Sequence, residues 1–349
     1  MRIGFQAGAI NERGMSVALF DYAMSAQEVL GHESVVFYSE EKSVPAVVEK
    51  FKDKLNLVPV PAGSDLRTVS EPYLLDFAYS IREGRKGSFD IAADRTGIHA
   101  VFRHFEPHGD VYAYVSQWLA NWMSGGRAPA VPHIVDLPEP SGTMREELNI
   151  PKDAFVVGRY GGFDQFNVPF ARKAVREAIE KRRYLYFVFV NTEKFLDHER
   201  ALFLPPIVNV PDKVRFIAAC DVGLNAKKIG ESFGLAIAEF LMLGKPVFSW
   251  AGGMDQNHVH MSPKSEWLYR TRHDLSRLLT SYRPSADDMD QARRSVECYR
   301  PDPVMRQFEK VFLSGGYCAD DLSVGRLFKL TRYLEEKAMR AKFRVWKSL

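Results

Sequence analysis

The chain has 349 residues, more than one ordinary hydrophobic core accommodates, so two domains of typical size are expected. Apolar residues make up 46% and charged residues 26%, as in ordinary globular proteins, and a net charge of +3 indicates no nucleic-acid partner. The three cysteines have no CxxC spacing, which argues against a disulfide framework or zinc site and favours a reducing cytoplasm. The N-terminal apolar stretch is broken by Gln6 and Asn11, so we expect no signal peptide, and no apolar run is long enough to span a bilayer.

The first half of the chain predicts an α/β domain. Ile3–Phe5 is an expected strand ending in a Gly-rich bend, a helical pattern then runs from Val17 to Val29, and Ser34–Tyr38 is a second expected strand. This strand–loop–helix–strand order is the unit of a parallel sheet. Further short apolar runs follow at Leu55–Val60, Leu75–Ile81, Ile98–Phe105 and Val111–Val115. A linker is predicted where prolines cluster in a polar stretch, at Pro129, Pro132, Pro138 and Pro140.

A second α/β pattern begins after Pro151. The sequence predicts a strand at Ala154–Gly158, a helix at Val168–Arg182 and a fully apolar strand at Tyr184–Val190. Strand or short-helix segments are expected at Val214–Cys220 and Val222–Leu224, a strand at Pro246–Trp250, and mostly helix from about Ser262 onward. Two successive units of this kind predict two Rossmann-like domains facing a cleft, with ligands beyond the carboxyl ends of the strands.

The most informative motif runs from Gly230 to Phe240, with the sequence GESFGLAIAEF, and Gly244-Lys245-Pro246-Val247 follows it. Two carboxylates, Glu231 and Glu239, have seven residues between them and bracket a small-residue turn that enters an apolar helix. Free backbone N–H groups and the positive end of a helix dipole favour a phosphate at such a turn. An acid beside a phosphate is electrostatically unfavourable. A role in binding hydroxyl groups therefore explains Glu231 better than a role in stabilising the fold. The pattern indicates a phosphate flanked by two polyols, as in a nucleotide-sugar.

Together with Gly158-Arg159, which opens the second half, this motif resembles that of the retaining GT-B glycosyltransferases of the large family 4. The resemblance spans the C-terminal half, and in the N-terminal half it rests on the Gly-rich first loop and on Tyr114-Val115-Ser116. It implies a nucleotide-sugar donor held mainly by the second domain, an acceptor bound mainly by the first, and no metal ion or cofactor. In that family's favoured mechanism the departing phosphate itself helps to deprotonate the acceptor on the same face.

Matched to this family, Glu231 is the acid that holds hydroxyls of the transferred sugar, and Glu239 is the one that holds the ribose. The matching diphosphate cradle is the backbone of Gly230, Ser232, Phe233, Gly234 and Leu235. If the helix starts near Gly234, Glu239 lies about 7–8 Å further along its axis, which suits a ribose beyond the phosphates. The alternative is a helix with one capping acid and one solvated acid.

Arg159 matches the arginine that clamps the leaving diphosphate, for which a guanidinium offers a bidentate fork. The chain departs from the family after this residue, because the usual Lys-Gly is replaced by Tyr160-Gly161-Gly162-Phe163-Asp164. Lys227, or failing that Lys228, is the expected substitute cation. An ordinary salt bridge remains the alternative for Arg159.

Other candidate residues follow from loop positions. In the first loop, Arg13 and Gly14 are expected near the donor phosphates and the acceptor, and Asn191 near the nucleotide, although a strand-end asparagine also forms turns. His104 is expected at the end of a first-domain strand against the transferred sugar, with Arg103 as the alternative by register. His258 and His260 form an HxH pair without a matching carboxylate or cysteine, so we expect no metal site.

The end of the chain, Leu322–Val345, predicts a charged amphipathic helix with a basic C-terminal part. Such a helix either lies on an anionic membrane or packs back across both domains. The expected organisation is an acceptor-side domain at 1–148, a nucleotide-sugar domain at 149–318 and a helical segment at 319–349.

These inferences predict a hexosyltransferase that transfers a sugar to a glycan or glycolipid hydroxyl with retention, as in polysaccharide biosynthesis. Its expected location is the cytoplasm, either free or at the inner face of the membrane. A sugar-nucleotide epimerase, a phosphorylase and a non-catalytic sugar-nucleotide or glycan-binding protein are the alternatives.

Overall fold

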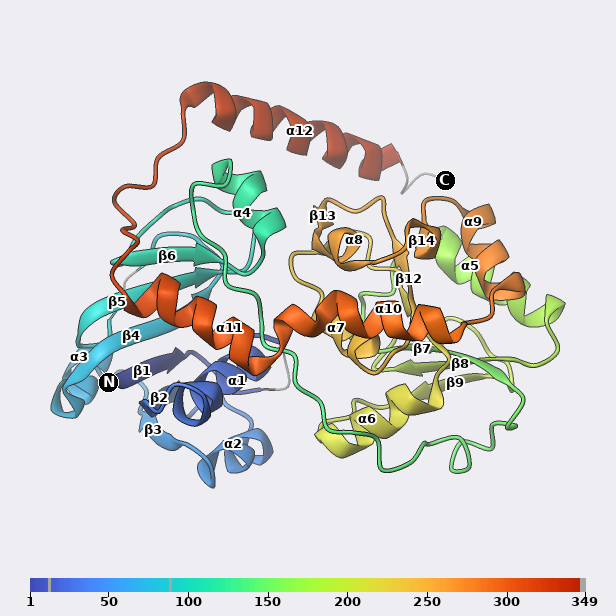
Figure 1. Cartoon of the computed structure of the whole chain (residues 1–349), viewed down its shortest axis with the longest axis horizontal. Helices are drawn as coiled ribbons and strands as arrows, with labels where there is room; N and C mark the ends of the chain where they lie inside the picture. Colours follow the sequence, from blue (N-terminus) through green and yellow to red (C-terminus); the bar gives the residue numbers. More distant parts are fainter. Residues whose placement is uncertain (12–13, 88–89, 346–349) are drawn as a thin grey trace. The chain divides into compact units, whose positions relative to one another are not determined.

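The computed structural model describes residues 1–11, 14–87 and 90–345, with the backbone alone for residues 342–345. The chain forms two compact units: Met1–Ile134 together with Pro301–Leu349, and Val135–Arg300 (Figure 1). Each unit is built on a six-stranded sheet whose strands pair in parallel. The predicted α/β class with two Rossmann-like domains is therefore confirmed.

The sheet of the first unit has the strand order β3-β2-β1-β4-β5-β6. Its strands are β1 Arg2–Ala7, β2 Glu33–Ser39, β3 Asn56–Val60, β4 Leu75–Arg82, β5 Ala93–Ala100 and β6 Val111–Tyr114. The helices between them are α1 Gly14–Glu28, α2 Pro45–Lys52, α3 Leu66–Ser70 with η1 Glu71–Tyr73, and α4 Gln117–Ser124 after β6. Strand β2 inside the sheet and strand β6 at its edge are almost fully buried, which is why both appear as continuous apolar runs in the sequence.

The second unit repeats this topology with the order β14-β12-β10-β7-β8-β9. Its main strands are β7 Phe155–Arg159, β8 Leu185–Val190, β9 Ala201–Leu204, β10 Val222–Asn225, β12 Val247–Trp250 and β14 Leu268–Tyr269. Its helices are α5 Pro169–Lys181, α6 Val210–Ala219, α7 Leu235–Met242, α8 Asn257–Met261, α9 Arg272–Ser281 and α10 Ala286–Val296, with short turns η2 Ser265–Trp267 and η3 Glu297–Tyr299. Counted from the first strand of each unit, both sheets follow the 3-2-1-4-5-6 order of doubly wound folds.

A second, two-stranded parallel sheet supports the motif region. It pairs β11, Gly230–Glu231, with β13, Asp255–Gln256, in the register Gly230 to Asp255 and Glu231 to Gln256. The Gly230–Glu231 segment, which lies just before α7, is therefore hydrogen-bonded to Asp255–Gln256, which follows α7 and β12 in the chain.

The boundaries of the units differ from those expected at residues 148 and 318. The chain enters the second unit after Ile134, inside the proline cluster, because the following segment binds to that unit: the N–H of Val135 donates to the carbonyl of Tyr299 and the N–H of Met144 to that of Arg215.

The chain returns to the first unit at Pro301, through α11 Pro301–Phe308 and η4 Glu309–Leu313. Phe308 and Phe312 bury their rings against Tyr79, at centroid distances of 5.2 and 5.3 Å. The predicted C-terminal helix is α12, Arg326–Val345, and it belongs to the same unit.

The run at Val214–Cys220, expected to be a strand or a short helix, belongs to helix α6, whose N-cap Asn209 accepts a hydrogen bond from the N–H of Asp212. One local expectation was wrong in detail. The run expected at Ile98–Phe105 contributes only its first residues, up to Ala100, to strand β5, which starts five residues before Ile98, at Ala93, in a more polar stretch.

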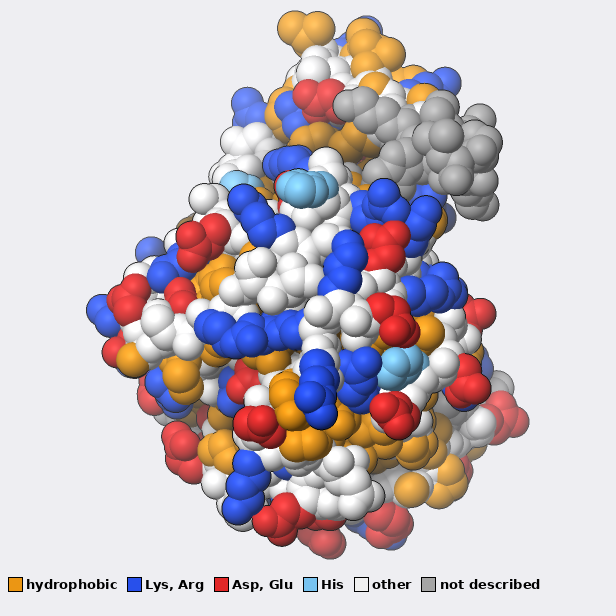
Figure 2. All heavy atoms as spheres, turned by 90° about the vertical axis from the view of Figure 1, so that its right-hand side faces the viewer, with side chains coloured by type: hydrophobic (Ala, Val, Ile, Leu, Met, Phe, Trp, Pro, Cys, Tyr) orange, Lys and Arg blue, Asp and Glu red, His pale blue; other side chains and the backbone are white. Residues whose placement is uncertain are grey.

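Lys and Arg side chains are interspersed with Asp and Glu on the face that carries α5 and α9, consistent with the small net charge (Figure 2). Among the described residues, no helix combines the length and apolar character that crossing a bilayer requires.

Candidate active site

The turn between β11 and α7 contains two glycines that its geometry requires. Gly230 has φ +84°, and a Cβ atom there would lie 1.9 Å from the carbonyl oxygen of Asp255. Gly234, the N-cap of α7, has φ +102°. Both conformations are unfavourable for residues with a side chain. Gly230 thus lets β11 approach the main chain of Asp255 in β13, and Gly234 lets the chain enter α7 through a left-handed conformation.

Glu231 is held at this turn by two side chains. Its Oε2 lies 2.7 Å from the Nζ of Lys227, and its Oε1 accepts a hydrogen bond of 3.2 Å from the Nδ2 of Asn225 at the end of β10. The side chains of Glu231 and Lys227 are 19% and 22% exposed, so both remain accessible to a ligand. The structure therefore brings together the acid and the cation that the sequence had suggested separately.

His258 of α8 fixes the main chain of the same turn, a contact that the sequence did not suggest. Its Nδ1 accepts a hydrogen bond of 3.3 Å from the N–H of Glu231, and its Nε2 lies 2.8 Å from the carbonyl oxygen of Trp250. These partners fit a neutral ring with the proton on Nε2. The ring is fully buried, and burial lowers its pKa from the ordinary histidine value.

The HxH pattern that singled out His258 therefore marks a positioning residue for Glu231. Within the part of the chain that the structure describes, no group of three or more His, Cys, Asp or Glu side chains could hold a metal ion.

Helix α7 begins with amide groups that have no partner inside the helix. The N–H of Ala238 donates to the carbonyl of Gly234, so the amides of Leu235, Ala236 and Ile237 precede the first helical hydrogen bond. Leu235 and Ala236 are half-buried. The turn accordingly combines a positive helix end with the ammonium group of Lys227.

Two members of the motif also support the unit internally. The Phe233 ring is 3% exposed and packs edge-on against Tyr299 at 5.1 Å, while the Phe233 carbonyl accepts a hydrogen bond from Asn257. Glu239 is 4% exposed and pairs with Lys213 of α6, with Nζ 2.5 Å from Oε1. Ser232, between the two glycines, is half-buried. No signal in the sequence linked Lys213 to the motif.

Arg159, at the end of β7, is 6% exposed and donates to protein oxygens on two loops. Its Nη1 bonds the carbonyl of Asn191 at 3.0 Å and the hydroxyl of Thr192, and its Nη2 bonds the carbonyl of Gly162 at 2.8 Å. Burial lowers the pKa of this guanidinium to about 10, and the charge of Glu231 acts in the opposite direction.

Asn191 directly follows β8 in the left-handed conformation, with φ +47°, and its Nδ2 donates to the carbonyl of Gly161 at 2.9 Å. Arg159 and Asn191 thus hold the 160–163 loop from both sides. The expected phosphate and nucleotide contacts of these two residues stay predictions.

The remaining candidates lie in the first unit. Arg13 lies outside the described residues, and Gly14 is the exposed first residue of α1, with open space where a Cβ would stand. His104 follows β5 in a loop and lies 3.2 Å from the Nε of Arg85. Burial lowers the pKa of His104 first, and the charge of Arg85 lowers it further. His104 stays a candidate.

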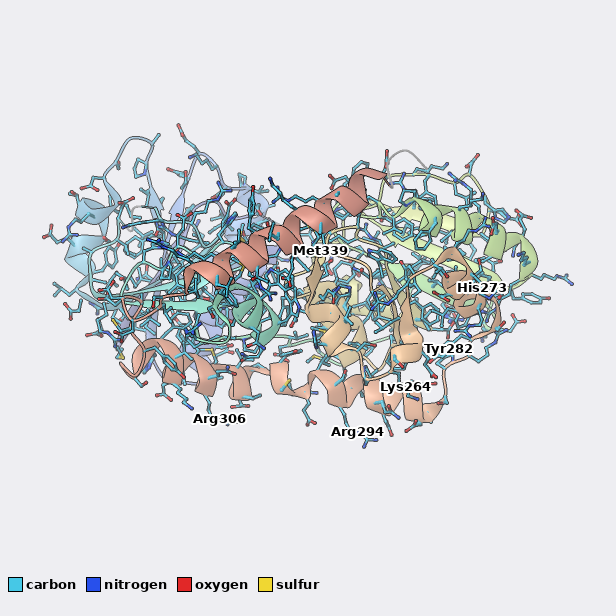
Figure 3. All side chains as sticks on the ribbon, turned by 90° about the horizontal axis from the view of Figure 1, so that it is seen from above. Lys264, His273, Tyr282, Arg294, Arg306 and Met339 are labelled. Atoms are coloured by element: carbon cyan, nitrogen blue, oxygen red, sulfur yellow. The ribbon has the colours of Figure 1, made fainter. Side chains whose placement is uncertain are left out.

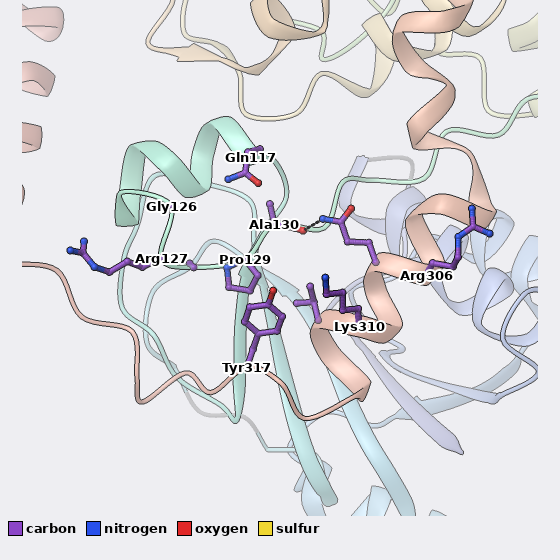
Figure 4. A pocket seen from close by; sticks show the side chains of 11 residues that line it. Gln117, Gly126, Arg127, Pro129, Ala130, Arg306, Lys310 and Tyr317 are labelled. Atoms are coloured by element: carbon purple, nitrogen blue, oxygen red, sulfur yellow. Dashed lines mark hydrogen bonds between the residues drawn. The ribbon is translucent and has the colours of Figure 1, made fainter.

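Two hollows in the described part of the chain are lined by other residues. One, of about 480 Å³ in the first unit, is lined by Gln117, Gly126, Arg127, Ala128, Pro129, Ala130, Arg306, Gln307, Lys310, Val311 and Tyr317. Figure 4 shows Arg127 and Arg306 pointing away from this hollow in different directions, and Figure 3 shows Arg306 at the outer side of α11. The other, of about 510 Å³, lies between Arg145 and Arg283. Neither is lined by a residue of the motif.

Known structures of the same architecture were found over most of the chain. HepE of Anabaena in complex with UDP-glucose has a TM-score of 0.66 at 15% identity, covering 89% of this chain and 98% of that one. A glycosyltransferase of Rickettsia africae has a TM-score of 0.67 at 11% identity, covering 90% and 98%. WaaG, a glycosyltransferase involved in lipopolysaccharide biosynthesis, has a TM-score of 0.56 at 12% identity, covering 93% and 100%. No protein-family model matches the sequence, and no curated protein matches it.

This chain has the GT-B fold. Identities of 11–15% establish the architecture alone. In this GT-B protein the residues described above come from the carboxyl ends of β7, β8 and β10 and from the start of α7, all within the second unit. These strand ends are the edge of a doubly wound sheet at which ligands bind.

Proposed function

We propose that this GT-B protein transfers a sugar from a nucleoside diphosphate sugar to an acceptor hydroxyl. The observation that carries the proposal is the turn entering α7, where an accessible carboxylate, Glu231, lies 2.7 Å from the ammonium of Lys227 beside free helix amides. The ligands of a similar structure support the choice of donor: HepE has been solved with UDP-glucose and with UDP.

The Lys227 contact explains how an acid can stand beside a phosphate. A carboxylate next to a diphosphate is repelled, but a cation placed between them attracts both. In this proposal the diphosphate accepts hydrogen bonds from the first amides of α7 and from Lys227, while Glu231 accepts hydrogen bonds from sugar hydroxyls. Charge that develops on the leaving diphosphate is then stabilised by groups already in place.

The finer features of the reaction are part of the same proposal. We assign retention of the anomeric configuration, a hexosyl donor and a glycan or glycolipid acceptor, as the family 4 resemblance implies, with Glu239 on the ribose. We also propose that no metal ion is needed, because Lys227 and the helix amides supply the positive charge. The free thiols of Cys220, Cys298 and Cys318 fit a reducing cytoplasm.

A second candidate is a non-catalytic sugar-nucleotide-binding protein. The contacts of Arg159 favour it, because both terminal nitrogens of that guanidinium already donate to protein oxygens. A protein that binds the donor but lacks a free clamp for the leaving diphosphate would hold it without turnover.

The two candidates separate in one experiment with a panel of uridine, adenosine and guanosine diphosphate sugars. Binding is measured by calorimetry, and release of nucleoside diphosphate by slow donor hydrolysis, in which water takes the sugar in place of the acceptor hydroxyl, is measured with and without EDTA. If the protein is a transferase, at least one donor should release its nucleoside diphosphate, at a rate that EDTA does not change. In the variant Glu231→Gln this rate should fall about 10- to 100-fold, because a hydrogen bond to a charged group is lost.

The control is Glu199→Gln, an exposed acid of the same unit, which should leave release unchanged. Binding without release of any donor would support the second candidate, and absence of binding would contradict both. The anomeric configuration of the product, read by NMR, tests retention.

A further inference from the structure

Helix α12 presents an exposed apolar stripe. Leu327, Leu330 and Leu334 are 78%, 53% and 55% exposed, and it is a contiguous group of exposed apolar residues, rather than a single one, that indicates an interaction site. Spacings of three and four residues place them on one face of the helix, and Ala338 and Ala341, also exposed, continue that face. The stripe therefore runs along four turns of the helix.

The opposite face of α12 already packs on the first unit. The Arg332 guanidinium lies over the Trp122 ring of α4 at 4.5 Å, and the Phe328 ring lies beside Gly125 at the end of the same helix. Arg103 forms an ion pair of 3.0 Å with Glu336. Because these contacts attach α12 without the leucines, the exposed stripe is not needed to hold the helix in place.

The charges of α12 are sorted between the two faces. Both acids lie on the packed side, where Glu335 pairs with Arg332 and Glu336 with Arg103, and Arg340 lies 3.5 Å from Glu336. The exposed cations are Arg326, Lys329, Lys337 and Arg340. At about 100° per residue they fall along one edge of the leucine stripe. At the top of the view in Figure 2, where α12 lies, hydrophobic side chains stand next to Lys and Arg.

We propose that α12 docks this protein onto an anionic lipid bilayer, with the helix lying in the plane of the interface. The leucines enter the boundary between headgroups and acyl chains, and the flanking cations contact the anionic headgroups. Tyr333, 53% exposed among these cations, has the amphipathic character typical of that boundary. Lys342, Arg344 and Lys347 continue the basic character of the sequence.

A second copy of the chain is a poorer occupant of the stripe. Helices that pair through an apolar seam use opposite charges beside it to choose a partner. Here the residues beside the seam are cations, while Glu335 and Glu336 are engaged on the packed side. Pairing two such stripes brings like charges together, whereas an anionic surface complements them.

The docking proposal does not depend on the proposed sugar transfer, so its test uses the full chain without any donor. Co-sedimentation is measured with vesicles of phosphatidylcholine alone and of equal parts phosphatidylcholine and phosphatidylglycerol. We expect about tenfold or stronger partitioning onto the anionic vesicles, weakened by salt. Replacing both Leu330 and Leu334 by Ser should weaken it by about tenfold or more. Lys337→Gln should weaken it roughly fivefold.

The matched control is Leu74→Ser, which removes a 79% exposed leucine of the same unit and should not change partitioning. Circular dichroism and melting verify that the variants are folded, as expected for exposed positions. Equal binding to both vesicle types, or binding that survives the double leucine substitution, would overturn the proposal. The proposal would also be overturned if light scattering showed a concentration-dependent dimer that the double leucine substitution dissociates, and if the wild-type protein did not bind the vesicles.

Discussion

Replacing Gly230 by Ala tests the geometry on which the candidate site depends. The added Cβ would lie 1.9 Å from the Asp255 carbonyl oxygen, whereas ordinary van der Waals contact begins near 3.4 Å. The backbone therefore has to move by about 1.5 Å, and the atom in the way is main chain that cannot rotate aside. The φ of +84° adds strain of its own for any residue with a side chain.

The expected magnitude follows from these two effects. A left-handed conformation at a residue other than glycine costs about 1–2 kcal/mol, and forced displacement of well-packed groups costs about 1–3 kcal/mol. We expect the second unit to lose about 3 kcal/mol, which lowers the melting temperature of a domain of this size by about 10 °C. Because β11 carries Glu231 as well as Gly230, the displacement should also abolish donor binding.

Melting by calorimetry and donor binding by titration measure both consequences. The control is Gly325→Ala, since Gly325 is exposed and no described atom lies within 4 Å of the position that its Cβ would take, so melting should change by less than about 2 °C. If Gly230→Ala melts like the wild-type protein and binds donor equally well, the steric reasoning for this turn is refuted.

Three further predictions follow from buried groups. Arg159→Lys should destabilise the protein by about 2–4 kcal/mol in denaturant titrations, because one ammonium cannot reach the oxygens on both loops that the guanidinium joins. Unchanged stability would contradict this structural role and leave Arg159 only a role in ligand binding. His258→Gln should weaken donor binding about tenfold or more while the protein stays folded, because the Glu231 amide loses its acceptor; an unchanged dissociation constant would contradict this positioning role. Burial lowers the pKa of His99 to about 4, below its value in the unfolded chain. The contribution of neutral His99 to the free energy of unfolding is therefore complete above pH 6.5, and up to about 3 kcal/mol is lost as the pH falls towards 4. Unfolding free energies that stay level between about pH 7 and 5 would contradict this expected loss of stability in acid.

Patterns that reflect burial on both faces of a parallel sheet could be predicted from the sequence. Tyr184–Val190 is apolar throughout because β8 lies between two strands and under helices, and its prediction was confirmed. The run at Val214–Cys220 was left open between strand and short helix, although the signals of a helix start were present, with Asn209 at the N-cap and Pro211 in the first turn.

The division into units was harder to predict for a physical reason. The segment from Pro301 to Leu313 has a clear helical periodicity, but periodicity states only that one face is buried, not which sheet buries it. Phe308 and Phe312 pack on Tyr79, more than 200 residues earlier in the sequence, so their contacts depend on the completed fold of the first unit.

In the candidate site, too, local features could be predicted from the sequence and contacts between distant residues could not. The two acids of the motif and the turn between them were visible because they are local in sequence. The contact of His258 with Glu231 spans 27 residues and that of Lys213 with Glu239 spans 26, and neither pairing follows from local spacing. Asn225 had one usable signal, its position at the end of a strand.

Burial separates the predicted site residues into two groups with different expected roles. Glu231 and Lys227, about one-fifth exposed, can meet a ligand without rearrangement of the protein. Arg159 and Glu239, 6% and 4% exposed, are already engaged by protein groups, so a diphosphate at Arg159 or a ribose at Glu239 has to displace those partners. Removing a buried partner leaves an unpaired charge, which is far more damaging than removing an accessible one. Substitutions at Glu231 should therefore reduce donor affinity in a stable protein, whereas those at Arg159 should reduce stability first, and any loss of turnover there has to be corrected for the fraction that remains folded.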